Sequence, residues 1–273
     1  MPEKPEVITV SNSLRPRLVG KEITGCNVYW DNIIAYPTTD EFKREVIGQK
    51  ILDVTTRGKF IKILLNKDVL LIHLRMEGKF FFRKKGDTIV KHEHVEFVLD
   101  DDISFRYHDV RKFGKMYLIP KERVDKVKPL NELGYEFDDS KLTKEYLYEK
   151  IHNKKLPIKT VLLDQSIITG IGNIYDDEIL FRSKISPYRK ANEVSLDECA
   201  EIIKNTRLVL SEAIKKGGTT IKSFTSSEGV HGLFQNELLV HGKKNDNCPS
   251  CGSKIEVCRI GGRGTYYCTK CQK

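Results

Sequence analysis

The chain has 273 residues, enough to bury a sizeable core and to form more than one domain. Its 47 Lys and Arg outnumber its 38 Asp and Glu, and the net charge of +9 favours a polyanionic partner such as nucleic acid. The sequence has no membrane-spanning apolar run and no signal-peptide pattern, and its 7 cysteines do not suggest a secreted disulfide framework, so we expect a protein of the reducing cytoplasm.

The opening residues, MPEKPEV, predict a helix that begins near Pro5, with Glu6 at the positive end of its dipole. Gly20 can end this helix. Apolar residues then recur at helical spacing: Val7, Val10, Leu14 and Leu18. The helix does not explain Pro2, which precedes it.

From about Ile51 to Ile119 the apolar period is two, which predicts short strands. The segments are KFIKILL, VLLIHL, KFFFR, HVEFVL and ISFRYH, and Asp100–Asp102 predicts a hairpin turn between the last two. We therefore expect residues 1–128 to form a β-sandwich or flattened barrel with a leading helix. His73-Leu-Arg-Met76 and Arg111-Lys-Phe113 follow predicted strands, where Met, Arg and Phe can act as wedges between stacked bases. Taken singly, each is more often core packing or a solvated charge.

The period changes after Lys128-Pro129, which predicts a small helical domain over residues 129–240. Ser195 and Glu198 have capping-box spacing at the start of the longest helix. Expected helices are Tyr146–Ile151, Ile158–Leu163, Ile174–Phe181 and Leu196–Ile214. Residues from about 217 to 240 are rich in Gly, Ser and Thr, and we expect a long functional loop there.

Gly170-Ile-Gly172-Asn173 precedes a predicted helix, and we interpret Asn173 as its N-cap. Free N–H groups at a helix N-terminus bind phosphate without base specificity. A capped turn without a ligand is an equal alternative, but the nearby Lys159, with Lys154 and Lys155, favours phosphate binding.

Two C-x2-C pairs, Cys248 with Cys251 and Cys268 with Cys271, are separated by 16 residues and predict one structural Zn²⁺ held by four thiolates. The residues between them predict a β-hairpin with a glycine-rich tip that carries Arg263. The segment 241–273 is basic and has the size of a ribbon that enters a DNA groove. Cys258 remains, and we interpret it as an ordinary buried thiol.

With these features together, the whole chain resembles the formamidopyrimidine-DNA glycosylase family of bacterial base-excision repair. Matching segments are PExPEV, RGKF around Lys59, HLRM, KHEH at His92, DVRKFG, LLDQ…GIGNIYDDEILF, TTIKSF around Lys222, GLFQNEL and GGRGTYYCTKCQ. The resemblance implies an α+β multidomain fold: an N-terminal β-sandwich, a helix–two-turn–helix domain and a zinc-finger hairpin. The chain departs from the family pattern at Lys4, Arg75, Val110 and Lys243.

The resemblance also gives Pro2 a role as the nucleophile after removal of Met1. An α-amine has a reference pKa of about 7.7–8.0, against about 10.4 for Lys, so more of it is unprotonated at neutral pH. A secondary amine that adds to a sugar C1′ forms a cationic iminium, an electron sink that promotes strand cleavage by β,δ-elimination. Glu3 would protonate the sugar ring oxygen or transfer protons during the reaction. Lys59 and Arg263 would be the other catalytic residues, and Glu6 would support the site.

The remaining roles that the resemblance implies concern damaged double-stranded DNA. The DNA-binding residues would be His73, Met76, His92, Arg111, Phe113, Lys159 and Asn173. Lys222, in the expected lesion loop, would lie near a base flipped out of the duplex. The protein would be a monomer associated with the bacterial nucleoid and would remove oxidised purines.

Three alternatives stay open. An endonuclease VIII-like enzyme shares this fold and prefers oxidised pyrimidines, although the HLRM and TTIKSF segments favour the purine enzyme. A non-catalytic DNA-damage binder would not need Pro2, Glu3 and Lys59 together. A zinc-ribbon RNA-binding protein would not need the wedge set of Met76, Arg111 and Phe113.

Overall fold

The computed structural model describes residues 1–219 and 232–273, and the chain forms two compact units. The first unit is Met1–Asn131 with Thr219–Gly232, and the second is Glu132–Gly218 with Leu233–Lys273.

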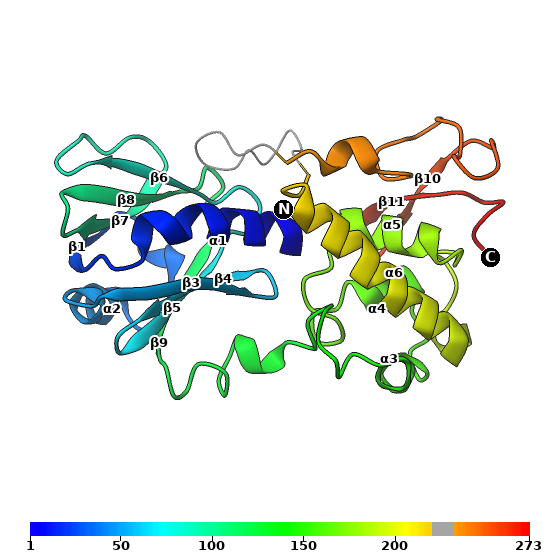
Figure 1. Ribbon diagram of the computed structural model, residues 1–273, viewed down its shortest axis with the longest axis horizontal. Helices are drawn as coiled ribbons and strands as arrows, with labels where there is room; N and C mark the ends of the chain where they lie inside the picture. The colour runs from blue at the N-terminus through cyan, green and yellow to red at the C-terminus, as the bar shows by residue number, and fades with distance from the viewer. Residues whose placement is uncertain (220–231) are drawn as a thin grey trace. The chain divides into compact units, whose positions relative to one another are not determined.

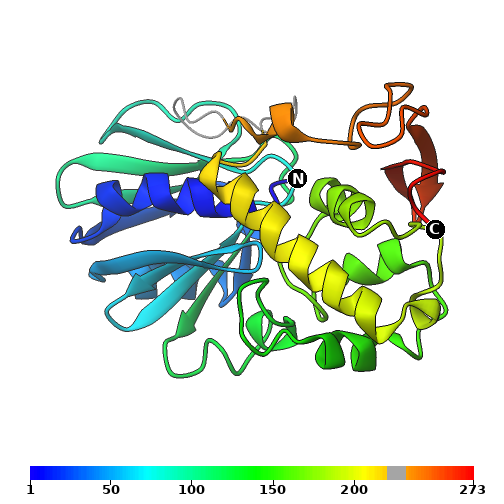
Figure 2. The same ribbon diagram turned by 45° about the vertical axis from the view of Figure 1, so that its right-hand side comes forward.

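The first unit is a sandwich of a four-stranded sheet, in the order β1-β7-β8-β6, and a five-stranded sheet, in the order β2-β9-β5-β4-β3. In Figures 1 and 2, helix α1 runs between the two sheets. The elements are α1 Lys4–Leu18, β1 Ile23–Val28, η1 Asp31–Ile33, β2 Ile34–Tyr36, α2 Thr39–Val46, β3 Ile51–Arg57, β4 Phe60–Leu65, β5 Asp68–His73, β6 Lys79–Lys84, β7 Glu93–Leu99, β8 Ile103–His108 and β9 Lys115–Pro120.

Helix α1 forms where the sequence predicts it, with Pro5 in its first turn and Gly20 just beyond its end at φ 92°. Its apolar face is buried against the sheets, because Val7, Leu14 and Leu18 are fully buried. The core joins this face to aromatic side chains of the four-stranded sheet and to aliphatic side chains of the five-stranded sheet. Burying that surface is the main source of stability of the unit.

The strands of the first unit are joined mostly by short antiparallel connections. Arg57 pairs with Phe60 across the β3–β4 turn, and Phe60 pairs with His73 across β4 and β5. The turn at Asp100–Asp102 joins β7 to β8, as predicted, with Asp102 at φ 59°. This register brings Lys59 and His73 to the same end of the five-stranded sheet.

The second unit is helical and ends in a β-hairpin. Helix α6 packs against α3 and α5 (Figure 2), and α5 contacts strand β11. Its elements are α3 Lys144–Ile151, α4 Ile158–Leu162, α5 Asn173–Arg182, η3 Ala191–Glu193, α6 Leu196–Lys215, η5 Phe234–Glu237, β10 Glu256–Ile260 and β11 Arg263–Tyr267; the short helix η2, Leu130–Glu132, spans the boundary between the units.

The predicted capping box of α6 is confirmed. The Ser195 N–H donates to the Glu198 carboxylate at 2.8 Å, and the Glu198 N–H donates to the Ser195 hydroxyl at 3.2 Å. The α+β fold, with its sandwich, helical segment and C-terminal hairpin, is confirmed as well. In the described part of the chain, no helix has the length and apolar character needed to cross a membrane.

The second unit is interrupted between Gly218 and Leu233, where the chain passes into the first unit. The two ends of this interruption are joined by backbone hydrogen bonds. The Leu233 N–H donates to the Lys216 carbonyl at 2.9 Å, and the Phe234 N–H donates to the Gly218 carbonyl at 3.0 Å. The departing and returning chains therefore lie side by side.

Candidate active site and DNA-contacting loops

The N-terminal segment forms a buried polar cluster in the first unit. Pro2 is buried, and Glu3, Lys4 and Glu6 are 3–5% exposed. Such burial of charged side chains is expensive unless they are paired or hydrogen-bonded, and it is typical of functional sites. The Lys4 ammonium donates to the Thr56 hydroxyl at 3.0 Å. Lys4, which the sequence analysis noted as a departure from the family pattern, thus has a partner on β3.

Glu6 holds this cluster in place through both of its carboxylate oxygens. Oε2 accepts the N–H of Glu3 at 2.8 Å. Oε1 accepts the N–H of Thr219 at 2.8 Å and the Thr219 hydroxyl at 3.1 Å. The side chain therefore ties the first residues of α1 to the point where the segment after Gly218 enters the first unit. These three bonds fix the position of Glu6, and its supporting role in catalysis stays a prediction.

Lys59 lies in the tight turn between β3 and β4, after Gly58 at φ 54°, and is 6% exposed. Its positive charge acts on His73, across the β4–β5 pair. Burial is the main cause that lowers the pKa of His73 to about 3, and the charges of Arg75 and Lys59 lower it further. His73 is therefore neutral at physiological pH.

The tautomer of His73 follows from its hydrogen bond. Its Nδ1 lies 3.0 Å from the N–H of Arg75 and accepts it. In a neutral imidazole the other nitrogen then carries the proton, so Nε2–H is a donor. A neutral histidine of this kind can donate to a phosphate oxygen.

The loop after β8 is organised around Asp109, which is fully buried. Its Oδ1 accepts the N–H of Arg111 at 3.0 Å, and its Oδ2 accepts the N–H groups of Phe113 at 2.9 Å and Gly114 at 2.8 Å. Phe113 remains 49% exposed, and the Arg111 guanidinium lies 4.9 Å from its ring centroid. A rigid backbone thus presents an exposed aromatic ring and a cation, as a base-inserting loop requires.

Met76 and His92 lie on neighbouring loops of the same unit. Met76 is half-buried in the turn after β5, where Arg75 adopts φ 54°. His92 adopts φ 73°, and its carbonyl accepts the N–H of Asp109 at 3.0 Å. This bond connects the loop that contains His92 to the loop that presents Arg111.

The turn between α4 and α5 is held by Gln165, a residue that the sequence prediction missed. Its amide donates to the carbonyls of Leu163 and Ile171, and its oxygen accepts the N–H of Gly170. The prediction of Asn173 as N-cap is wrong by one residue, because Gly172 is the N-cap and Asn173 is the first helical residue. The carboxamide of Asn173 donates instead to a carbonyl of the C-terminal hairpin.

That contact joins α5 to the tip of the hairpin within the second unit. Asn173 Nδ2 lies 2.9 Å from the carbonyl of Gly264, which follows Arg263. Arg263 itself is exposed. A Cβ at Gly261 would lie 3.0 Å from the Thr160 hydroxyl, so the tip also packs closely on α4. Arg263 is therefore presented from a hairpin that rests on the helices.

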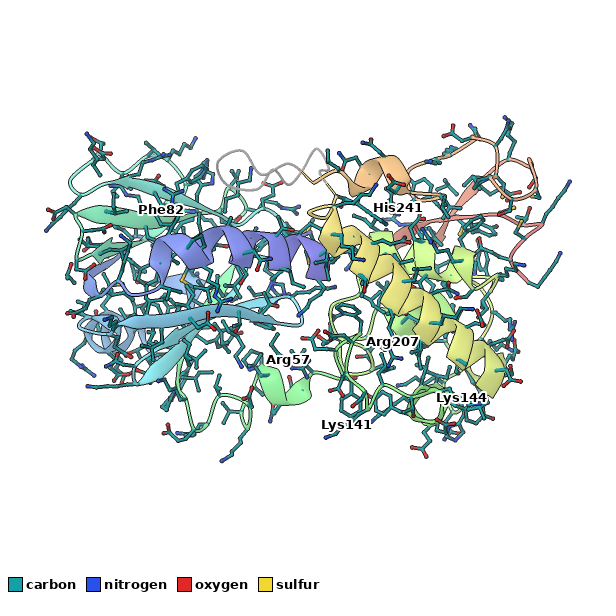
Figure 3. All side chains as sticks on the ribbon, viewed as in Figure 1. Arg57, Phe82, Lys141, Lys144, Arg207 and His241 are labelled. Carbon is teal, nitrogen blue, oxygen red and sulfur yellow. The ribbon has the colours of Figure 1, made fainter. Side chains whose placement is uncertain are left out.

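Lys159 does not have the surface position that the predicted phosphate contact requires. Its side chain is fully buried, and its ammonium donates to Asp177 at 2.6 Å and lies 3.7 Å from Asp176. We correct the predicted role, because this ammonium neutralises carboxylates inside the second unit. The other oxygen of Asp177 lies 2.6 Å from Nδ1 of His241, which is labelled in Figure 3, and accepts the N–H of Tyr266.

Glu178, the next residue on α5, binds the backbone that leads into the hairpin. Its carboxylate accepts the N–H groups of Leu239, Val240 and His241 at 2.8–2.9 Å. The sequence could have indicated this network, because three consecutive acidic residues lie on a helix whose neighbouring residues are apolar and buried. Asp177 and Glu178 together fasten the C-terminal segment to α5.

The four cysteines of the C-x2-C pairs lie in one cluster, with all sulfurs within 4.8 Å of one another. The sulfurs of Cys251 and Cys268 are 3.5 Å apart, and those of Cys248 and Cys271 are 3.8 Å apart. A tetrahedral Zn²⁺ with Zn–S bonds of about 2.3 Å needs sulfur–sulfur edges of roughly 3.8 Å. The cluster therefore fits one zinc ion. Lys222, predicted in the lesion loop, lies outside the described residues.

Three family models match successive parts of the chain. Residues 1–116 match the formamidopyrimidine-DNA glycosylase N-terminal domain, and residues 133–225 match the H2TH domain of the same enzymes. Residues 246–273 match the zinc finger found in FPG and IleRS. The zinc finger match and the cysteine cluster agree that this chain has a site for one zinc ion.

Curated relatives cover the whole chain. A formamidopyrimidine-DNA glycosylase of Oceanobacillus iheyensis is 42% identical over 273 residues, which is all of this chain and 98% of that protein. One of Geobacillus kaustophilus is 41% identical over the full length of both chains. Among solved structures, wild-type Lactococcus lactis Fpg with DNA containing N7-benzyl-Fapy-dG has a TM-score of 0.92 at 33% identity, covering all of both chains. The same protein with abasic-site DNA gives 0.92 at 33% identity over 99% of each chain.

Proposed function

This chain belongs to the formamidopyrimidine-DNA glycosylase family, and on that ground we propose that it is a bifunctional DNA glycosylase and AP lyase. Its substrates would be oxidised purines in duplex DNA of the bacterial nucleoid. The observation that carries the proposal is the buried N-terminal cluster, in which Glu6 fixes the backbone at Glu3 directly beside Pro2. The Lactococcus lactis structures contain DNA with N7-benzyl-Fapy-dG, which supports this substrate class, and DNA with an abasic site, which supports the lyase step.

Pro2 acts as the nucleophile once removal of Met1 frees its nitrogen. The nitrogen lone pair forms a bond to sugar C1′ while the C1′–base bond breaks, and the leaving base takes the proton of the Pro2 N–H. Glu3 supplies a proton to the ring oxygen as the sugar opens, which leaves the iminium between Pro2 and C1′. Loss of a proton from C2′ then expels the 3′-phosphate, and loss of a proton from C4′ expels the 5′-phosphate. Water then hydrolyses the iminium and frees the Pro2 amine. The positive charge of Lys59 neutralises a DNA phosphate and stabilises the negative charge that develops during the reaction.

The DNA contacts divide between the two units. In the first unit, His73 donates from Nε2–H to a phosphate, and Met76, Arg111 and Phe113 fill the space that an extruded nucleotide leaves. In the second unit, the N-terminus of α5 and Arg263 bind backbone phosphates. The four cysteines would hold Zn²⁺, which fixes the hairpin that carries Arg263.

Oxidised pyrimidines are a second substrate class with specific support. The same Lactococcus lactis protein has been solved with DNA containing an oxidised pyrimidine, and this chain matches it with a TM-score of 0.91 at 32% identity. A panel of duplexes with each lesion and each opposite base would rank the two classes. Lys222 lies in the segment expected to select among them.

Borohydride trapping tests the mechanism. It should reduce the iminium and leave a covalent protein–DNA adduct on Pro2. Keeping Met1 or adding an N-terminal tag makes the proline nitrogen an amide, and it should abolish trapping while DNA binding persists. Pro5→Ala is the matched control, because Pro5 lies in the first turn of α1 and its nitrogen is an amide in every form of the chain, so this variant should still trap.

The location of the adduct decides between the alternatives. A peptide map with DNA on Pro2 supports the proposed nucleophile, whereas DNA on Lys59 with Pro2 unmodified overturns it. Lesion binding without adduct or cleavage in the processed wild type would show a non-catalytic damage binder.

A further inference from the structure

Tyr107, near the end of β8, is fully buried between two loops that carry predicted base-inserting residues. One loop, residues 74–78, carries Met76. The other, residues 109–114, carries Arg111 and Phe113. We propose that Tyr107 is a positioning residue that fixes these two loops relative to each other, so that they enter the DNA as one unit. This inference rests on the proposed glycosylase function for its consequence, but the geometry stands independently of it.

The side chain of Tyr107 approaches each loop most closely at a glycine. A Cβ at Gly114 would overlap the Tyr107 hydroxyl oxygen and lie 2.7 Å from Cζ. A Cβ at Gly78 would overlap the same hydroxyl and lie 2.9 Å from Cζ. Both distances are shorter than carbon atoms tolerate without displacement. One tyrosine tip therefore occupies the space that a side chain at either position would need.

The hydroxyl is also linked to the scaffold of the second loop. Tyr107 donates to Oδ2 of Asp109 at 3.4 Å, the oxygen that accepts the N–H groups of Phe113 and Gly114. Burial, with the nearby Asp109 charge, raises the pKa of Tyr107 well above its ordinary value. The hydroxyl thus keeps its proton and its role as donor at neutral pH.

The second loop has a further support on its other side. The Lys112 ammonium lies 3.8 Å from the ring centroid of Trp30, and the Lys115 ammonium donates to the Asn32 carbonyl. Trp30 is the single tryptophan of the chain. Its exposure to solvent therefore reports whether Lys112, and with it the loop, stays in place.

Fixing the loops in advance matters because base extrusion needs several side chains to arrive together. If each loop moved separately, ordering them would cost conformational entropy during insertion. A preformed pair avoids that cost, and a misplacement of about 1 Å can slow a reaction by up to about a hundredfold. Cleavage at a preformed abasic site has no base to extrude and does not need this arrangement to the same degree.

The test is Tyr107→Phe, which removes only the hydroxyl between the loops. Excision of 8-oxoguanine from intact duplex should slow about tenfold. Cleavage of a preformed abasic duplex should change by less than about twofold. Phe105→Leu is the control, because Phe105 lies two residues earlier on β8 and packs on Phe80 in the core. It should lower the melting temperature without changing the ratio of the two rates.

A second measurement needs no DNA. Acrylamide quenching of Trp30 should rise in Tyr107→Phe and stay at the wild-type level in Phe105→Leu. Unchanged quenching in Tyr107→Phe, or a rate ratio equal to that of Phe105→Leu, overturns the positioning role. If the wild type acts on neither DNA, the proposed function fails, and the quenching result still decides whether Tyr107 holds the loop.

Discussion

Replacing Glu6 by Gln tests whether the N-terminal cluster is held as the hydrogen bonds indicate. In the native chain, two carboxylate oxygens accept three donors, one from Glu3 and two from Thr219. A carboxamide has one oxygen, so it can keep the Thr219 bonds or the Glu3 bond. Its NH₂ group then faces a buried N–H donor. The variant therefore loses one acceptor and the negative charge while keeping its volume.

The expected cost follows from these losses. A buried donor left without an acceptor costs about 1–3 kcal/mol, and each remaining bond weakens by about 1 kcal/mol when its acceptor becomes neutral. Relief from burying a charge offsets part of this. We expect a net loss of roughly 2–4 kcal/mol, or roughly 5–10 °C in melting temperature for a protein of this size. Because the Glu3 backbone is released, borohydride trapping on abasic DNA should slow as well.

Calorimetry and the trapping rate measure the two effects. Glu41→Gln is the matched control, since Glu41 has the same third position in a capping box on α2 and accepts from the Thr38 N–H and hydroxyl, but is only half-buried. Solvent can replace its lost bond. A melting temperature for Glu6→Gln within about 1 °C of that control would refute the reasoning.

Further predictions concern the zinc site, the buried lysine and one histidine. Cys268→Ser should lose zinc, measured as metal per chain, and bind DNA less tightly; one retained zinc per chain would contradict the assignment. Lys159→Met leaves the Asp177 charge buried without its ammonium and should cost roughly 3–5 kcal/mol in urea unfolding. The salt dependence of DNA binding by Lys159→Met should match that of the wild type. If the slope of log affinity against log salt concentration is smaller by about one in the variant, Lys159 contacts a DNA phosphate and our correction is wrong. His73 has a folded pKa of about 3 against an ordinary 6.5, so the unfolded chain binds more protons between these values. Its contribution to stability is complete above pH 6.5 and is lost as the pH falls toward 3, and His73→Phe should flatten this part of the stability profile.

The sequence allowed correct prediction of the elements whose pattern lies within a short stretch of residues. The period of two over residues 51–119 gave the strands, and the spacing of Val7, Val10 and Leu14 gave α1, because burial of one face imposes that spacing. The cysteine cluster was also predictable, since each C-x2-C pair brings two ligands together without help from the rest of the fold.

The errors came from side chains whose partners lie far along the chain. Lys159 was predicted to bind DNA from its basic surroundings, but its counter-charge at Asp177 is 18 residues away on the next helix. Asn173 has a residue type that favours an N-cap, but its carboxamide is used by Gly264, 91 residues later. Neither pairing has a periodic signature. The space between Gly78, Tyr107 and Gly114 likewise exists only after β6 and β8 have paired.

The hydrogen bonds between Lys216 and Leu233 and between Gly218 and Phe234 have an evolutionary consequence. These bonds join the two parts of the second unit on either side of the segment between Gly218 and Leu233. The helices and hairpin of that unit therefore do not depend on the length of this segment. Lengthening a closed connection is thermodynamically inexpensive, roughly 0.6 kcal/mol for each doubling. Insertions, deletions and substitutions between Thr219, which Glu6 holds, and Leu233 are therefore open to selection while the helical unit stays folded.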